Sequence, residues 1–290
     1  MSPANDSLDT LRREIDEIDR AMHDLLIQRA GLSGRVRSAK GGPNATIIHP
    51  AREAEIIRRL VRRHSGALPP RFIVLLWRQI ISAMTRLQGS FAVAVYAPKG
   101  ETGLLQIAHE HFGGGTPFLP MAAPGSVLSA VADGEAAVGV LPLPEDPHAD
   151  AWWRHLAVES AKPMRILARL PFARVADAQE ALVVGCQPFE PTGEDRGYLL
   201  VETTNDVSRT RLSGSLETAG LKAVSFADAD AAAEAEAHTG PRLQLVETDP
   251  YCGDDDSALA SFVERLGEGV VRVRSLGGYA VPVAVPNPAP

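Results

Sequence analysis

The chain has 290 residues, of which 45% are hydrophobic and 22% charged, a composition typical of a globular protein. It holds no apolar run of about 18 residues that could span a membrane, and its polar first ten residues lack the pattern of a signal peptide. We therefore expect a cytoplasmic protein with no membrane partner. The two cysteines, Cys186 and Cys252, have no metal-type spacing and lie far apart in the sequence, so we expect neither a metal site nor a disulfide framework from them.

The net charge of −7 is unevenly distributed along the chain. Residues 1–90 carry 15 Lys and Arg against 9 Asp and Glu, whereas the remaining residues carry 14 against 27. A basic segment can bind nucleic acid or a small anion. The basic residues here are scattered among acidic ones without aromatic residues for base stacking, which argues against nucleic acid and favours a small anionic ligand.

Residues 7–40 are predicted to form one long helix, about 50 Å in length. Apolar residues recur along it at alternating steps of four and three: Leu11, Ile15, Ile18, Met22, Leu25, Leu32 and Val36. A helix of this length cannot bury such a stripe by itself. After "GGPN", residues 49–65 and 70–88 give two further helices, and the set of three predicts an intertwined helical dimer.

Two cations interrupt the apolar stripe of the first helix. Arg29 takes a stripe position, and Lys40, eleven residues later, points to the same side of the helix. Each could bury only its stem or pair with a nearby carboxylate. Arg12 lies roughly 100° away around the helix, so it could reach the same pocket only from a symmetry-related helix. With Arg52, Glu53 and Gln88 from the other two helices, these residues indicate a site for a small dianion that carries a hydroxyl group.

In the rest of the chain the sequence predicts an α/β region followed by a region with a βαββαβ order of strands and helices. Residues 91–178 alternate short strands and helices, and residues 179–290 follow the βαββαβ order with a C-terminal tail. The predicted fold class is therefore α+β multidomain, with an all-α domain at 1–90. His109 and His111 lie two apart near a glycine run, and we interpret them as part of a solvated helix end because no third metal ligand accompanies them.

The segment "LRREIDEIDRAMHDLLIQRAGLSGRVRSAK…HPAREAEII…LLWRQIISAMTRLQ" resembles the all-helical chorismate mutases, in particular the domain that begins bifunctional chorismate mutase–prephenate dehydratase proteins. The resemblance implies a homodimer that binds chorismate and prephenate without a cofactor. It also implies the roles of the site residues: Arg29 and the partner's Arg12 would hold the two carboxylates, Lys40 and Gln88 the ether oxygen, and Glu53 the ring hydroxyl, with Arg52 in support.

Two positions depart from the pattern of that family. His49 stands where relatives often carry Asp, and Met84 stands where a Ser often contacts a carboxylate. A His can still donate a hydrogen bond and a Met cannot, so we expect a modest loss of substrate affinity with activity retained.

The remaining residues resemble a prephenate dehydratase that has lost parts. Only about forty residues separate "GVLPLPED" from "ALVVGC", which leaves no room for a second lobe, and Gln179, Glu180 and Ala181 replace the catalytic Thr-Arg-Phe. We expect dehydratase activity to be absent. The βαββαβ stretch resembles an ACT regulatory domain without the usual amino-acid-binding segments. The predicted function is chorismate mutase, and the alternatives are a non-enzymatic amino-acid sensor or partner-binding regulator and an isochorismate pyruvate-lyase.

Overall fold

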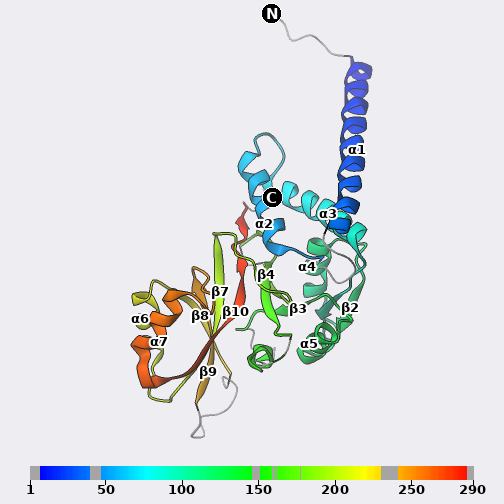
Figure 1. The fold of residues 1–290 in the computed structure, drawn as a ribbon. Helices are drawn as coiled ribbons and strands as arrows, with labels where there is room; N and C mark the ends of the chain where they lie inside the picture. The colour runs from blue at the N-terminus through cyan, green and yellow to red at the C-terminus, as the bar shows by residue number, and fades with distance from the viewer. Residues whose placement is uncertain are drawn as a thin grey trace, which may run out of the picture. The chain divides into compact units, whose positions relative to one another are not determined.

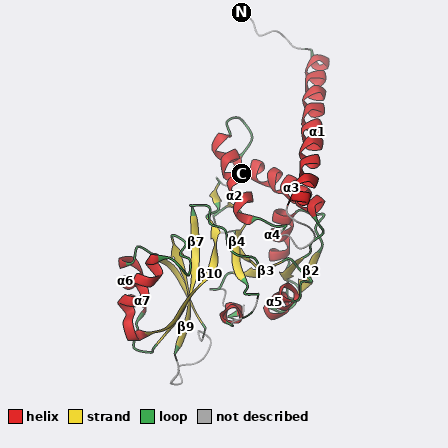
Figure 2. Ribbon diagram, in the orientation of Figure 1, coloured by secondary structure: helices red, strands yellow, loops and turns green. Residues whose placement is uncertain are grey.

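The computed structural model describes residues 7–39, 47–145, 151–158, 160, 162–176, 178–229 and 241–285. The chain divides into two compact units. Residues up to 47 together with 83–90 form the first unit, and residues 48–82 together with 91–290 form the second. Figure 1 shows the elements along the chain, and Figure 2 shows which segments are helices and which are strands.

The first unit contains the long helix α1 (Leu8–Ala39), 32 residues in length, as the sequence predicted. Its apolar stripe lies in solvent. Exposure ranges from 42% to 64% at Leu8, Leu11, Ile15, Ile18, Met22, Leu25, Leu32 and Val36. None of the described helices is both long and apolar enough to cross a membrane. The stripe is therefore an apolar surface that no described residue of the chain covers along most of α1.

Helices α2 (Pro50–Arg63) and α3 (Pro70–Gln88) also match their predicted ranges. Pro50 occupies the first turn of α2, where its missing N–H costs no helical hydrogen bond. In the second unit, Ala54 and Ile57 of α2 and Val74 and Ile81 of α3 share one apolar cluster with Phe172. The last residues of α3, from Ala83, belong to the first unit.

Arg58 anchors α2 to the residues around 192–194 and 281 within the second unit. Its side chain is 8% exposed, and its guanidinium donates to Thr192 Oγ1 at 2.8 Å and to the carbonyl oxygens of Glu194 and Val281, both at 2.7 Å. Arg62, one turn further along α2, pairs with the Glu194 carboxylate. Because a buried guanidinium needs several acceptors to offset its desolvation, these contacts fix the orientation of α2 in this unit.

The first half of the second unit is an α/β layer. Its strands have the order β2-β1-β3-β6-β4, with β2 and β3 parallel to β1 and with β6 antiparallel to β3 and β4. The bounds are β1 (Val93–Tyr96), α4 (Gly103–Phe112), β2 (Phe118–Met121), α5 (Pro124–Ala132), β3 (Val138–Pro142), the 3₁₀ helix η1 (Trp152–Ala157), β4 (Arg165–Leu170), β5 (Ala173–Arg174) and β6 (Ala181–Gly185). Both hydrogen-bonded neighbours of β6 lie in this layer, although the predicted domain boundary at 178 precedes it.

The second half has the predicted βαββαβ order. Its strands form an antiparallel sheet with the order β10-β7-β9-β8, and α6 and α7 pack on one face of that sheet (Figure 1). The bounds are β7 (Asp195–Thr203), α6 (Arg209–Thr218), β8 (Lys222–Asp228), β9 (Arg242–Asp249), α7 (Ser257–Leu266), the 3₁₀ turn η2 (Gly267–Gly269) and β10 (Val270–Ala280). Ser208 and Asp256 cap the two helices through their side chains, which explains where α6 and α7 begin.

Several local features differ from the sequence analysis, among them β4 and β5, which were not individually predicted as strands. Strand β2 was not predicted, because "FLPM" is short, contains a proline and is only partly buried. The C-terminal segment was predicted to be a tail, but Val283 and Ala284 form β11 and pair with β5. His111 was predicted in a solvated helix end, yet it is buried.

A single register pair joins the two halves into one nine-stranded sheet in the described part of the chain. Gly277 of β10 lies opposite Ile166 of β4 in parallel register. Gly277 has a φ of +92°, and a Cβ built there would lie 2.4 Å from the carbonyl oxygen of Ile166. Only glycine allows this backbone conformation and this close approach together.

The substitution Gly277→Ala is expected to lower the free energy of unfolding by about 3 kcal/mol, because it adds backbone strain and a clash with the backbone of β4. Chemical denaturation followed by tryptophan fluorescence measures the change. Gly214→Ala is the matched control: Gly214 lies inside α6 with open space around it, so alanine there should be neutral or slightly stabilising. Equal stability of the two variants would contradict the role assigned to Gly277.

Candidate functional site

The residues that the sequence analysis placed in one site are distributed over both units. Arg12, Arg29, Met84 and Gln88 belong to the first unit, and His49, Arg52 and Glu53 belong to the second. Lys40 lies outside the described residues. We therefore describe the candidate residues of each unit separately.

In the first unit, the two arginines of α1 have different surroundings. Arg29 is partly buried, and this burial lowers the pKa of its guanidinium. Arg12 is 66% exposed, and its Nη1 lies 3.6 Å from Asp9 Oδ1, one helical turn away. A partly desolvated cation binds an anion more strongly than a fully hydrated one, so Arg29 is the better placed of the two to bind a carboxylate within its own chain.

The two candidate residues of α3 lie one turn apart, near the end of the helix. Met84 is buried and Gln88 is partly exposed. Residues four apart share one helix face, so the thioether and the amide lie along the same stripe of α3. Met84 offers hydrocarbon and a weakly accepting sulfur, and it has no hydrogen-bond donor for a carboxylate.

In the second unit, Glu53 of α2 forms an ion pair with Arg78 of α3. Arg78 Nη1 donates to Glu53 Oε2 at 2.7 Å, and the two side chains are 4% and 14% exposed. Phe172 lies against the other side of Arg78, with its ring centre 5.0 Å from the guanidinium carbon. The carboxylate of Glu53 is thus held in a fixed position between two helices.

The electrostatics of this pair are dominated by burial. Burial raises the pKa of the Glu53 carboxyl above its usual value, and Arg78 together with the backbone and side chain of His49 offset only part of that effect. Burial likewise lowers the pKa of Arg78, opposed by Glu53. A carboxylate has about four acceptor positions, so Glu53 can accept a ligand hydroxyl in addition to the bond from Arg78.

His49 and Arg52 lie beside Glu53 in sequence but make different contacts. His49 precedes the first turn of α2, and its Nδ1 lies 3.9 Å from the carboxylate of Glu190. Arg52 is 61% exposed and donates to Glu55 at 3.1 Å. Adjacent residues on a helix are about 100° apart, which is why Glu53 faces the interior while Arg52 faces solvent.

Arg78 is a buried residue of this site that the sequence analysis did not identify. The sequence carries a signal for Arg78. This residue interrupts the apolar run "FIVLLWRQIISAM" of α3, just as Arg29 interrupts the apolar stripe of α1. A cation in an apolar helix face requires a buried partner or a ligand. In the described structure that partner is Glu53.

A second buried polar cluster surrounds Glu180, where the sequence analysis expected a lost catalytic residue. Arg169 of β4 binds both carboxylate oxygens of Glu180, with Nε–Oε1 at 3.1 Å and Nη2–Oε2 at 2.7 Å. Arg169 also donates to Tyr279 Oη at 3.0 Å and to Glu247 at 3.3 Å. Burial and the Glu247 carboxylate raise the pKa of Tyr279 to about 12. Glu180 is therefore committed to a closed network of ion pairs.

Comparison with known proteins gives a family match for the helical part. Residues 11–89 match the family Chorismate mutase type II, which confirms the predicted resemblance for this part of the chain. The bifunctional chorismate mutase/prephenate dehydratase of Aquifex aeolicus is 34% identical over 142 residues, 48% of this chain and 39% of that protein. That of Pseudomonas aeruginosa is 32% identical over 143 residues, with the same coverage of 48% and 39%. The matched part of the chain thus spans about two fifths of these relatives' length.

Two solved structures have more distant similarity. A prephenate dehydratase from Streptococcus mutans is 12% identical, with a TM-score of 0.46, and the match covers 67% of this chain and all of that one. A structure described as GqqA, a novel type of quorum quenching acylases, is 18% identical, with a TM-score of 0.47, covering 67% of this chain and 95% of the other.

Removing the cation of the buried pair should destabilise the protein strongly. We expect Arg78→Met to cost about 3–5 kcal/mol, because it leaves Glu53 buried without a counter-charge. The matched control is Arg52→Met, which breaks the exposed pair with Glu55 and should cost less than about 1 kcal/mol. Urea denaturation compares the variants, and the double variant Glu53→Gln/Arg78→Met should recover part of the loss. Equal losses of stability in Arg78→Met and Arg52→Met would contradict the burial of the pair between Glu53 and Arg78.

Proposed function

We propose that this chain catalyses the rearrangement of chorismate to prephenate, a step of aromatic amino acid biosynthesis, through residues 11–89. The match of these residues to Chorismate mutase type II carries the proposal. It is supported by the chemistry of the residues that resemble the chorismate mutase pattern, which provide several cations, one buried carboxylate and one amide. They provide no nucleophile paired with a base, and the reaction requires none.

The proposed mechanism rests on positioning and electrostatics. The rearrangement is unimolecular, so the protein needs to hold the substrate in its compact conformation and to stabilise the charge that grows on the ether oxygen as its bond breaks. In this proposal Lys40 and Gln88 donate hydrogen bonds to the ether oxygen of the substrate. A fixed cation interacts more strongly with the growing charge than with the neutral ether of the ground state, and this difference accelerates the reaction.

The remaining roles follow the charge of each group. Arg29 holds one substrate carboxylate, Arg52 supports the anionic site, and Glu53 accepts the hydrogen bond of the ring hydroxyl. Partial burial of Arg29 supports its role, because a desolvated guanidinium forms a stronger bidentate contact with a carboxylate. The ion pair with Arg78 supports the role of Glu53, since it holds the carboxylate in one place. His49 and Met84 make supporting contacts only.

The active form in this proposal is a homodimer in which Arg12 binds the second carboxylate in the partner's site. Two observations support it. The apolar stripe of α1 is exposed along nearly its whole length, and Arg12 lies about 100° around the helix from Arg29. Burying even part of eight large apolar side chains provides several kcal/mol, enough to drive association of two α1 helices.

We further propose that the domains at 91–178 and 179–290 do not dehydrate prephenate. Glu180 stands where the dehydratase pattern has its arginine, and Arg169 already binds both of its carboxylate oxygens. A dianionic substrate would meet a carboxylate there instead of a cation. The βαββαβ part, which is ACT-like in strand order, has an assembly role in this proposal, and the protein works in the cytoplasm without a cofactor.

We expect Lys40→Ala to lower kcat/KM for chorismate by about 10²–10³-fold, the usual cost of losing one donor to a charge that develops in the transition state. Loss of chorismate absorbance measures the rate in the full-length protein. The matched control is Lys99→Ala, because Lys99 is exposed and lies outside the helical domain. A near-normal rate for Lys40→Ala would overturn the proposed mechanism.

The same reactions distinguish the competing functions. Phenylpyruvate should not appear faster than in a sample without enzyme, and faster formation would show that dehydratase activity is retained. Release of pyruvate from isochorismate at a rate above that of chorismate loss would assign the site to a lyase. If the unmodified chain turned over neither chorismate nor isochorismate, the proposed activity would be wrong and the alternative of a non-enzymatic regulator would remain.

Hybrid dimers test whether Arg12 acts across the dimer. Arg12→Ala and Lys40→Ala chains should each be nearly inactive alone. In a mixed dimer, one site carries both changes and the other carries none, so activity should return to about half of the normal value per mixed dimer. Co-expression with two different affinity tags isolates these mixed dimers. If Arg12 served its own chain's site, each site would keep one change and no activity would return.

A further inference from the structure

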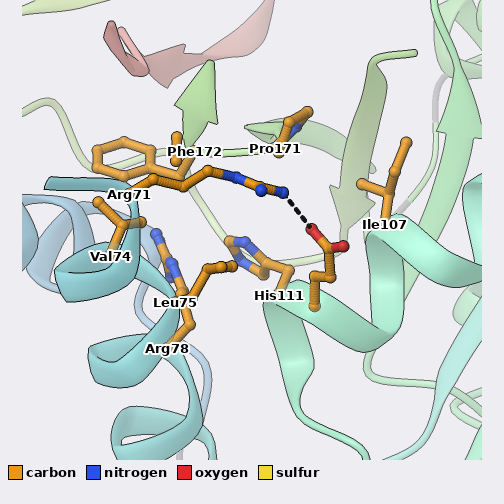
Figure 3. Close-up of a pocket in the computed structure, with 10 residues that line it drawn as sticks. Arg71, Val74, Leu75, Arg78, Ile107, His111, Pro171 and Phe172 are labelled. Atoms are coloured by element: carbon orange, nitrogen blue, oxygen red, sulfur yellow. Dashed lines mark ion pairs between the residues drawn. The ribbon is translucent and has the colours of Figure 1, made fainter. Parts of the chain in front are cut away.

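The ion pair that holds Glu53 is backed by an aromatic residue from outside the helical segment. Phe172 follows β4, and its ring centre lies 5.0 Å from the guanidinium carbon of Arg78. Figure 3 shows the Arg78 side chain extending from α3 toward this ring, beside a small hollow that both residues line. Both are buried, and both belong to the second unit. The contact is therefore shielded from water.

Arg78 depends on this ring and on Glu53 for its orientation. Its Nη1 donates to Glu53 Oε2 at 2.7 Å, while its Nε, which is buried, has no hydrogen-bond partner among the described residues. The face of an aromatic ring attracts a cation, and the attraction is strongest where both groups are desolvated. The guanidinium thus lies between a carboxylate that accepts its hydrogen bond and a ring that attracts its charge.

The ring itself is held in place by the C-terminal part of the second unit. The carbonyl oxygen of Phe172 accepts a hydrogen bond from the backbone N–H of Val283 at 2.8 Å, and Ala173, the next residue, pairs with Val283 where β5 meets β11. Arg58 of α2 lies over the same ring, with its guanidinium carbon 5.9 Å from the ring centre. One ring therefore lies against a cation from each of the two helices between which Glu53 is held.

Phe172 could instead act only as a piece of the apolar core. It belongs to a cluster with Ala54 and Ile57 of α2 and with Val74 and Ile81 of α3. Any apolar side chain that fills the space would serve such a core, whereas only an aromatic ring presents a face that attracts a guanidinium. The two roles therefore predict different consequences when the ring is replaced by an aliphatic side chain.

We propose that Phe172 is a positioning residue of the chorismate site, because its ring holds Arg78 against Glu53 and so fixes the carboxylate that accepts the hydroxyl of the substrate. The inference rests on the proposed function. Residues 11–89 match the mutase family, and Phe172 lies beyond them, so the α/β region supplies part of the support of the site. That region then serves the rearrangement without any dehydratase chemistry of its own.

Loss of the ring should affect KM for chorismate far more than kcat. The substrate hydroxyl takes no part in the bond changes, so its hydrogen bond to Glu53 stabilises the ground state and the transition state alike. We expect Phe172→Leu to raise KM about five- to tenfold and to change kcat by less than about twofold, since a displaced carboxylate keeps only part of its hydrogen bond. Steady-state loss of chorismate absorbance in the full-length protein measures both constants, and an unchanged KM would overturn the proposal.

Two further variants separate the aromatic face from apolar packing and from stability. Phe172→Met keeps a long, adaptable apolar side chain but lacks the aromatic face, so it should raise KM as Phe172→Leu does. Phe262→Leu is the matched control, because Phe262 is fully buried in the cluster beneath α6 and α7 and its loss should lower the urea midpoint without changing KM. Circular dichroism checks that the variants fold. A normal KM in Phe172→Met, or an equal rise of KM in Phe262→Leu, would overturn the proposal.

A double-variant cycle tests whether the ring acts through Glu53. In the Glu53→Gln background, Phe172→Leu should raise KM further by no more than about twofold, because the contact that the ring positions is already weakened. The urea midpoints of the same four proteins give the cycle without a substrate, and the two shifts should not add, since both residues contact Arg78. Additive shifts would overturn the link between Phe172 and Glu53.

The two kinds of measurement separate this inference from the proposed function. If the unmodified chain converts chorismate and Phe172→Leu keeps a normal KM, the proposed function stands and the positioning role of Phe172 is wrong. If the unmodified chain converts no chorismate, the proposed function and the substrate role of Phe172 are both wrong, and the urea midpoints alone decide whether the ring holds Arg78 against Glu53.

Discussion

The apolar stripe of α1 is the constraint on which the proposed activity depends. A helix of 32 residues presents large aliphatic side chains at nearly every turn, and they remain in solvent in the single chain. Water disfavours such a surface in proportion to its area, so the helix is completed only when a second apolar surface covers it. In the proposed homodimer a second α1 would provide that surface, and the same association would bring a cation from one chain toward the substrate of the other.

Cations within apolar helix faces have a common role in this protein. Arg29 on α1 and Arg78 on α3 both have pKa values lowered by burial, and both interrupt stripes of hydrocarbon. Burial costs free energy because the guanidinium loses hydration, and a bound carboxylate offsets that cost. Arg78 has its carboxylate in Glu53, while its remaining surface lines a hollow beside Phe172. A partly desolvated guanidinium is a stronger ligand for an anion than a hydrated one.

The sequence predicted the elements better than their arrangement. The three helices and the βαββαβ order follow from hydrophobic period and from caps such as Ser208 and Asp256, which act within a few residues. Strand β2 escaped prediction because it is only four residues long and contains a proline, and the burial of His111 escaped because it depends on α3, some thirty residues away in the sequence. The role of Arg58 depends on acceptors more than 130 residues distant, a pairing that no local pattern encodes. Glu53 was identified from its place in the first turn of the second helix, and the family resemblance implied its role, but its pairing with Arg78 becomes evident only when α2 and α3 are packed together.

The contacts that connect the two halves of the large sheet should depend on temperature in a particular way. The backbone joins them at one register pair, Gly277 with Ile166, while Arg169, Glu180, Glu247 and Tyr279 link them through buried ion pairs and hydrogen bonds. Hydration of charged groups becomes less favourable on heating, so the desolvation cost of such pairs falls as the temperature rises. This connection should therefore weaken less in warm conditions than an apolar contact of the same size, and the two halves should stay joined until the surrounding strands melt.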